Sequence, residues 1–141
     1  MSRWILGLLL PLAFLVACGG SSETAGHQPA VVEEVAGTDV SRITLTPEAA
    51  KRLDIKTAAI KENGGSRVIP YSAIFYSPTG EAWTYTNPEG LTFVRQAIVV
   101  DSIDGARVLL KQGPERGTKV ATVGVAELYG AESGVGADSG H

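Results

Sequence analysis

The chain contains very little of what would build a covalent or metal-based framework. Its single cysteine, Cys18, cannot form an internal disulfide, so packing and strand pairing have to hold the fold. One histidine, His27, lies in a polar stretch and the other, His141, is the last residue. We therefore expect no metal site and no cofactor, because no histidine pair shares a folded element.

Strong charge and long apolar runs are missing as well. The formal net charge is −3 and there is no cluster of five or more basic residues, which argues against nucleic acid as a partner. No apolar run reaches the ~20 residues of an ordinary membrane-spanning helix. The remaining composition, with 44% hydrophobic and 19% charged residues in 141, is typical of one globular domain.

The amino terminus has the pattern of a lipoprotein signal peptide. Arg3 precedes the uncharged run WILGLLLPLAFLVA at residues 4–17, which suits a signal-peptide core. The run ends in Leu15, Val16 and Ala17 before Cys18, which resembles the bacterial lipobox, and the thiol is the group that would take the lipid. We expect cleavage before Cys18 and a lipid anchor there. The alternative is a cleaved signal peptide that contains a cysteine by chance.

The rest of the chain divides into a tether, a β domain and a tail. Residues 18–40 begin with GGSSETAGHQP, which has the composition of a flexible linker, although residues 31–35 could form a short edge strand or stay extended. We place the folded domain at residues 41–128. The Gly-rich segment 129–141 is expected to be a disordered tail that adds nothing to a core.

A short helix is predicted near the start of the domain. Thr46 is a suitable N-cap, Pro47 suits the first helical position, and Glu48 lies near the positive end of the helix dipole. A strand at 43–45 precedes this helix, and residues 53–60 return to alternation before the turn Asn63-Gly64-Gly65-Ser66.

Five strand candidates follow, separated by turns that contain Pro or Gly. They cover residues 67–69 continuing through 73–76, then 82–86, 91–100, 106–111 and 119–127. We expect Pro70 to break the first, and the 91–100 strand to be central because it is apolar on both faces. The fold class is therefore mainly β, a small antiparallel barrel or sandwich-like domain with one short α-helix.

Several of these segments resemble one known family. The motifs are VIPYSAI at 68–74, WTY at 83–85, FVR at 93–95 with IVV at 98–100, the turn at 113–117 and VATVG at 120–124. They are similar to the membrane-proximal, C-terminal domain of the periplasmic adaptor subunits (membrane fusion proteins) of RND-type efflux pumps. Residues 45–57 are similar to a segment of the family's heavy-metal branch. The resemblance implies a β domain beside a membrane transporter.

The chain also departs from that family. A full adaptor carries lipoyl-like and barrel domains and usually a long helical hairpin between these segments, whereas here residue 60 is followed at once by a turn and residue 68. The turn GPERGT at 113–118 replaces the family's usual Leu and Asp. A chain this short cannot bridge a pump to an outer-membrane channel.

No catalytic group is predicted. Asp101 and Asp104 flank a turn, and Glu127 and Glu132 are expected to be a solvated strand end rather than an acid–base pair. Trp83, Tyr85 and Phe93 are either core residues or, together with Arg95, a partner surface, since Trp, Tyr and Arg dominate interface energetics.

The function expected from these patterns is that of a lipid-anchored, non-enzymatic accessory protein of the cell envelope. It would sit on the outer face of the cytoplasmic membrane or in the periplasm, held by the lipid on Cys18, and would dock on an RND-type or other transporter. The alternative is a cell-surface binding module for a small ligand or metal ion, unrelated to efflux.

Overall fold

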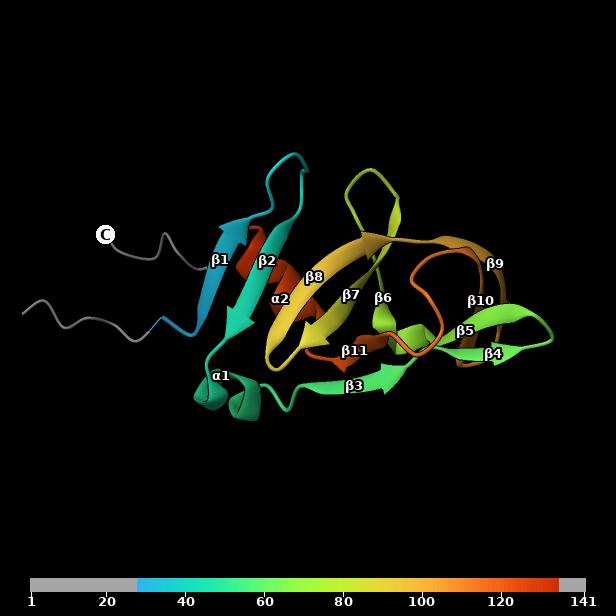
Figure 1. Cartoon of the computed structure of the whole chain (residues 1–141), viewed down its shortest axis with the longest axis horizontal. Helices are drawn as coiled ribbons and strands as arrows, with labels where there is room; N and C mark the ends of the chain where they lie inside the picture. The colour runs from blue at the N-terminus through green and yellow to red at the C-terminus, as the bar shows by residue number, and fades with distance from the viewer. Residues whose placement is uncertain (1–27, 135–141) are drawn as a thin grey trace, which may run out of the picture.

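The computed structural model describes residues 28–134, and within them two antiparallel sheets form a sandwich-like β domain (Figure 1). The 7-stranded sheet has the order β1-β2-β8-β7-β11-β3, with β6 paired to β7. Its strands are β1 (Ala30–Glu34), β2 (Ser41–Leu45), β3 (Lys56–Ala59), β6 (Ile74–Tyr76), β7 (Ala82–Glu89), β8 (Thr92–Ala97) and β11 (Lys119–Val123).

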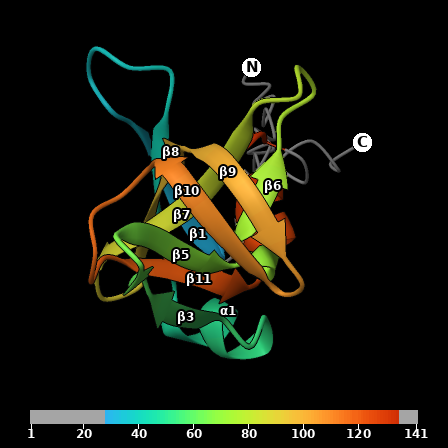
Figure 2. The same ribbon diagram turned by 90° about the vertical axis from the view of Figure 1, so that its right-hand side faces the viewer.

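The 4-stranded sheet has the order β4-β5-β10-β9 and faces the viewer in Figure 2. Its strands are β4 (Lys61–Asn63), β5 (Ser66–Pro70), β9 (Val99–Asp104) and β10 (Arg107–Gln112). The mainly β, sandwich-like fold class is confirmed, although the sheets do not close into a barrel.

The predicted first helix is present as α1 (Pro47–Arg52). Its N-cap is Thr46, whose side-chain oxygen accepts a hydrogen bond from the amide of Ala49 at 3.1 Å, and Pro47 occupies the first turn. The turn expected at residues 63–66 is also present, because it joins β4 to β5 with Asn63 opposite Ser66.

A second helix, α2 (Val125–Glu132), lies where the end of a strand and a disordered tail were predicted. The reason is helical spacing: Val125 and Leu128 are both buried and three residues apart, so one helix face meets the sheet. Ala131 also packs against the core, so the prediction that this segment adds nothing to a core is wrong as far as Gly134. Residues 135–141 lie outside the described part.

The folded domain also begins earlier than predicted. Residues 30–34 were assigned to the tether, but β1 pairs with β2 over five residues, from Ala30 opposite Leu45 to Glu34 opposite Ser41. Hydrogen bonds to β2 use the backbone groups on one side of this segment, and a linker composition does not reveal them. The edge strand that the sequence left open at residues 31–35 is therefore formed.

The strand predicted at 91–100 is two strands in two sheets. β8 pairs with β2 and β7, whereas β9 pairs with β10 in the other sheet. The chain changes sheet at Ile98, whose side chain is 5% exposed and packs between the sheets. Its neighbours Ala97 and Val99 are exposed, so the apolar pattern in the sequence continues through the crossing without marking it.

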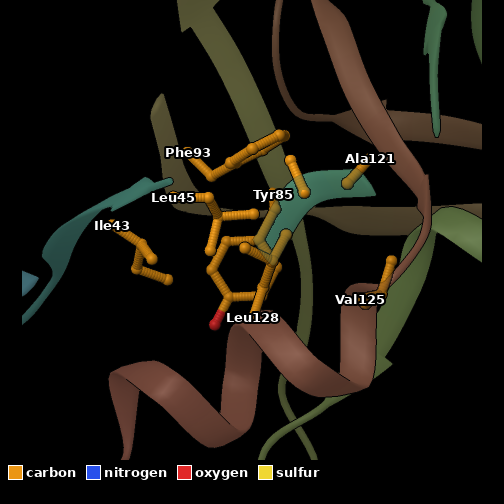
Figure 3. Close-up of a cluster of buried hydrophobic side chains, with 8 residues drawn as sticks. Ile43, Leu45, Tyr85, Phe93, Ala121, Val125 and Leu128 are labelled. Atoms are coloured by element: carbon orange, nitrogen blue, oxygen red, sulfur yellow. The ribbon is translucent and has the colours of Figure 1, made fainter. Parts of the chain in front are cut away.

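Two clusters of buried side chains form the core. The helix-side cluster lies between the 7-stranded sheet and the two helices, and Figure 3 shows most of its members: Ile43, Leu45, Ala50, Tyr85, Phe93, Ala121, Val125 and Leu128. The inter-sheet cluster joins the two sheets and consists of Ile60, Ile69, Ala73, Ile98, Val108, Leu110 and Val120.

Two strands of the larger sheet have buried side chains on both faces. On β11, Val120 belongs to the inter-sheet cluster and its neighbour Ala121 to the helix-side cluster. On β7, Thr84 and Tyr85 are both 0% exposed, on opposite faces. β7 and β11 are therefore the strands covered on both faces, whereas the sequence predicted this for the 91–100 strand.

The β11–α2 connection depends on Gly124. Its φ is +85°, in the left-handed region, and an added Cβ would lie 2.1 Å from Ile55 Cδ1. Glycine therefore lets α2 start directly after the strand and turn back over the sheet. Among residues 28–134 neither helix is long and apolar enough to cross a membrane.

Candidate functional site

The predicted partner-surface residues divide into a buried pair and a half-buried pair. Tyr85 and Phe93 are 0% and 1% exposed and belong to the helix-side cluster, so they cannot form an outward surface. Trp83 and Arg95 are half-buried and remain accessible. The alternation that places Trp83 and Tyr85 on one face of β7 holds, but α2 covers that face at Tyr85.

One carboxylate organises the polar groups on this face. The Glu132 side chain, on the last residue of α2, is only 7% exposed. Its Oε2 accepts a hydrogen bond from the Tyr85 hydroxyl at 2.5 Å, and Oε1 accepts one from the Ser41 amide at 3.1 Å. Glu132 therefore ties the end of α2 to β7 and to the start of β2.

Arg95 completes the cluster from β8. Its Nε lies 3.0 Å from Glu132 Oε1, an ion pair in which the N–H is not directed at the oxygen well enough to count as a hydrogen bond. The guanidinium also donates to the Asp39 carbonyl oxygen at 2.5 Å. Its carbon lies 4.6 Å from the centroid of the Trp83 ring, which is cation–π geometry.

We call these four side chains, Trp83, Tyr85, Arg95 and Glu132, the Glu132 cluster. Cross-strand register explains how three of them meet, because β7 and β8 place Trp83 opposite Ala97 and Tyr85 opposite Arg95. Figure 3 shows the Tyr85 hydroxyl pointing at α2, which carries the fourth member. In the described part of the chain, Trp83 Nε1 is buried and meets no acceptor.

The electrostatics of the cluster keep Tyr85 neutral. Burial first, and then the hydrogen bond to Glu132 and its negative charge, raise the pKa of the Tyr85 phenol well above its ordinary value of 10.0. Phe75 stacks on the Tyr85 ring with centroids 4.9 Å apart and planes 11° apart. The Tyr85 hydroxyl therefore donates a hydrogen bond to Glu132, while the Phe75 ring packs against the face of the Tyr85 ring.

Sequence reasoning missed Glu132, which was assigned to a solvated strand end with Glu127. Both residues are in α2 instead, where Glu127 is exposed and the side chain of Glu132 is only 7% exposed. The spacing of Val125, Leu128 and Glu132 was the available signal, since these residues share one helix face. A glutamate on that face has to meet a partner, because burying an unpaired charge is costly.

A shallow groove lies beside the cluster, where both ends of the described chain meet. Its apolar lining includes Pro29, Val32, Leu45, Leu53 and Ala131. Arg52, Glu127 and Glu132 supply charges. The groove is bounded by β1 and the two helices and was not anticipated from the sequence.

The other predicted site residues fall outside what the structure places. Leu15, Val16, Ala17 and Cys18 precede residue 28, so the lipidation prediction concerns residues outside the described part. Residues 28–134 contain no group of three or more His, Cys, Asp or Glu side chains placed to hold a metal ion.

The fold defines the class of protein only as a small two-sheet β domain with two short helices packed on one sheet. Comparison of the chain with protein families, with curated proteins and with solved structures finds no match in any of the three. The likeness to efflux adaptors therefore remains a hypothesis based on sequence motifs.

Proposed function

We propose that this protein is a lipid-anchored, non-enzymatic accessory protein of the cell envelope that docks on a membrane transporter or another envelope partner. The observation that carries the anchoring is the lipobox-like sequence ending at Cys18, followed by a fold that begins at Ala30. Twelve residues span at most about 40 Å when extended, at ~3.3–3.6 Å each. The β domain would thus be held close to the bilayer surface.

The docking part of the proposal is supported by Trp83 and Arg95. These two side chains stack on each other while each keeps part of its surface accessible, and Glu132 fixes the arginine. A guanidinium and an indole held in place before binding lose little conformational entropy on contact with a partner. Such residues are the ones that most often carry interface energy.

The anchor is tested by Cys18→Ala in the full chain. We expect the wild-type protein in the membrane fraction with a lipid mass on Cys18, and the variant unlipidated and largely in the soluble fraction. Two acyl chains are needed for lasting attachment, so loss of the thiol should release the protein. Recovery of the variant with membranes at the wild-type level would contradict the anchor.

Docking is tested by cross-linking in intact membranes followed by affinity recovery and identification of the partner. We expect Trp83→Ala to lower recovery of a specific partner about tenfold, equivalent to ~1.4 kcal/mol. The exposed Tyr76 lies on another strand and face, so Tyr76→Ala is the matched aromatic control. Thermal unfolding of both variants separates loss of docking from loss of the fold, and equal recovery from both would refute the assignment of the surface.

A second candidate function is a binding module for a small ligand, and the groove beside β1 favours it. The groove combines apolar side chains with Arg52, Glu127 and Glu132 in its lining. Leu53→Arg would fill it with a charge. Ligand-induced thermal stabilisation of the wild-type chain that disappears in this variant would favour binding over docking.

A further inference from the structure

Within residues 28–134, the outer edge of β1 is regular and pairs with no other strand. β1 lies at one end of the 7-stranded sheet, and β2 is its strand neighbour there (Figure 1). The β1–β2 pairing runs through five residues without a register shift. Val31 and Val32, on opposite faces of the strand, are 53% and 42% exposed.

The direction of the backbone groups follows from two hydrogen bonds that bracket the strand. The Thr46 amide donates to the Pro29 carbonyl at 3.0 Å, and the Val35 amide donates to the Val40 carbonyl at 3.0 Å. Hydrogen-bonded pairs alternate along antiparallel strands, so the odd-numbered residues of β1 face β2. Ala30, Val32 and Glu34 therefore direct their N–H and C=O groups away from the sheet.

The outer strands β3, β4 and β9 in the described part carry features that protect them from pairing. β4 is three residues long and entirely polar, and β9 carries two aspartates and two register shifts against β10. β3 begins with Lys56 and has a register shift against β11. β1 has neither proline, lysine nor bulge, and its two valines are consecutive.

We propose that β1 pairs with the β1 strand of a second copy of this chain, antiparallel and centred on Val32. In that register the two Val32 residues exchange backbone hydrogen bonds, and each Ala30 exchanges them with Glu34 of the other copy. The edge of one sheet would thereby continue into the edge of the other. This interface is independent of the docking function proposed above.

The charges along β1 and the position of Val32 are compatible with a second copy as the occupant. Centring on Val32 places Glu33 opposite Val31 and Glu34 opposite Ala30, so no like charges stand directly opposite each other. Each Glu33 is also opposite Arg42 of its own β2. Val32 lines the groove next to α2. The pairing would therefore bring Val32 of one copy against Val32 of the other beside this groove.

The register gives the experiment its controls. Val32 is opposite itself, and hydrogen-bonded antiparallel pairs have Cα atoms about 5.5 Å apart, within disulfide range. Glu34 is four residues from its equivalent across the interface, about 14 Å at ~3.4 Å per residue. V32C should therefore cross-link to itself on oxidation of the full-length chain in membranes, and E34C should not.

We expect at least tenfold more disulfide dimer from V32C than from E34C, given the distance limits of the bond. Mixed A30C and E34C chains should cross-link with each other. Oxidation of the wild-type chain, whose single cysteine is Cys18, measures how much disulfide dimer Cys18 forms by itself. Failure of V32C to exceed E34C, or cross-linking of E34C to itself, would overturn this interface.

A substitution without new thiols gives a second test. Val32→Pro removes one outward N–H at the centre of the interface and leaves the odd-numbered bonds to β2 intact. We expect the full-length chain in detergent to sediment as a dimer and the proline variant as a monomer, both with unchanged circular dichroism. A wild-type monomer, or a dimer that survives Val32→Pro, would refute the proposal.

Discussion

Removing the carboxylate of Glu132 should cost more stability than removing any exposed acidic group of α2. Glu132→Ala takes away the acceptor of the Tyr85 hydroxyl and of the Ser41 amide, and the partner of Arg95. Breaking a buried ion pair from one side costs about 3–5 kcal/mol. Because 20% of the Arg95 side chain is exposed and water can screen it, we expect the lower value of about 2–3 kcal/mol.

The assay is urea unfolding at neutral pH, followed by circular dichroism, with thermal unfolding as a second measure. A loss of this size lowers the melting temperature by about 8–15 °C in a domain of this length. Glu127→Ala is the control, since Glu127 lies on the same helix but is exposed, and its loss should stay below about 1 kcal/mol. Equal losses for the two variants would show that the Glu132 cluster does not hold α2 on the sheet.

Three further predictions concern single positions. Gly124→Ala should destabilise the domain by about 2–4 kcal/mol, because alanine is strained in the left-handed region and its Cβ would overlap Ile55. Gly130 has open space around it, so Gly130→Ala should stabilise the domain by about 0.5–1 kcal/mol, and urea unfolding measures both changes. Ile98→Ala should lower the free energy of unfolding by about 2–4 kcal/mol, and Val99→Ala, at a neighbouring residue that is 43% exposed, by less than about 1 kcal/mol. Equal losses for the two variants would show that Ile98 is not the buried residue at which the chain changes sheet. The raised pKa of Tyr85 favours the neutral phenol in the folded state. The contribution of Tyr85 to the unfolding free energy should therefore be constant below about pH 10 and fall above it, and Tyr85→Phe should reduce the slope above pH 10.

The local elements could be predicted because short-range chemistry specifies them. Thr46 and Pro47 define the start of α1, and Asn63 to Ser66 define a hairpin turn, and both are present. The alternation of Trp83 and Tyr85 also gave the correct face of β7. These signals lie within a few residues of the feature that they predict.

The missed features depend on contacts between distant parts of the chain. An apolar residue at position 98 fits both the interior of one long strand and a crossing between two sheets. Only the pairing of β9 in the second sheet shows that the chain crosses at Ile98. Glu132 looked solvated because its partners, Tyr85 and Arg95, are 47 and 37 residues away in sequence. β1 was assigned to the tether because its pairing partner, and not its composition, makes it a strand.

The strand that serves both clusters, β11, has a mechanical consequence. Val120 and Ala121 are bonded neighbours, yet each belongs to a different hydrophobic cluster, so neither cluster can loosen without displacing the backbone that the other rests on. The two halves of the molecule should consequently melt in a single step. A perturbation that loosens the helix-side cluster should therefore also destabilise the 4-stranded sheet, because β11 belongs to both clusters.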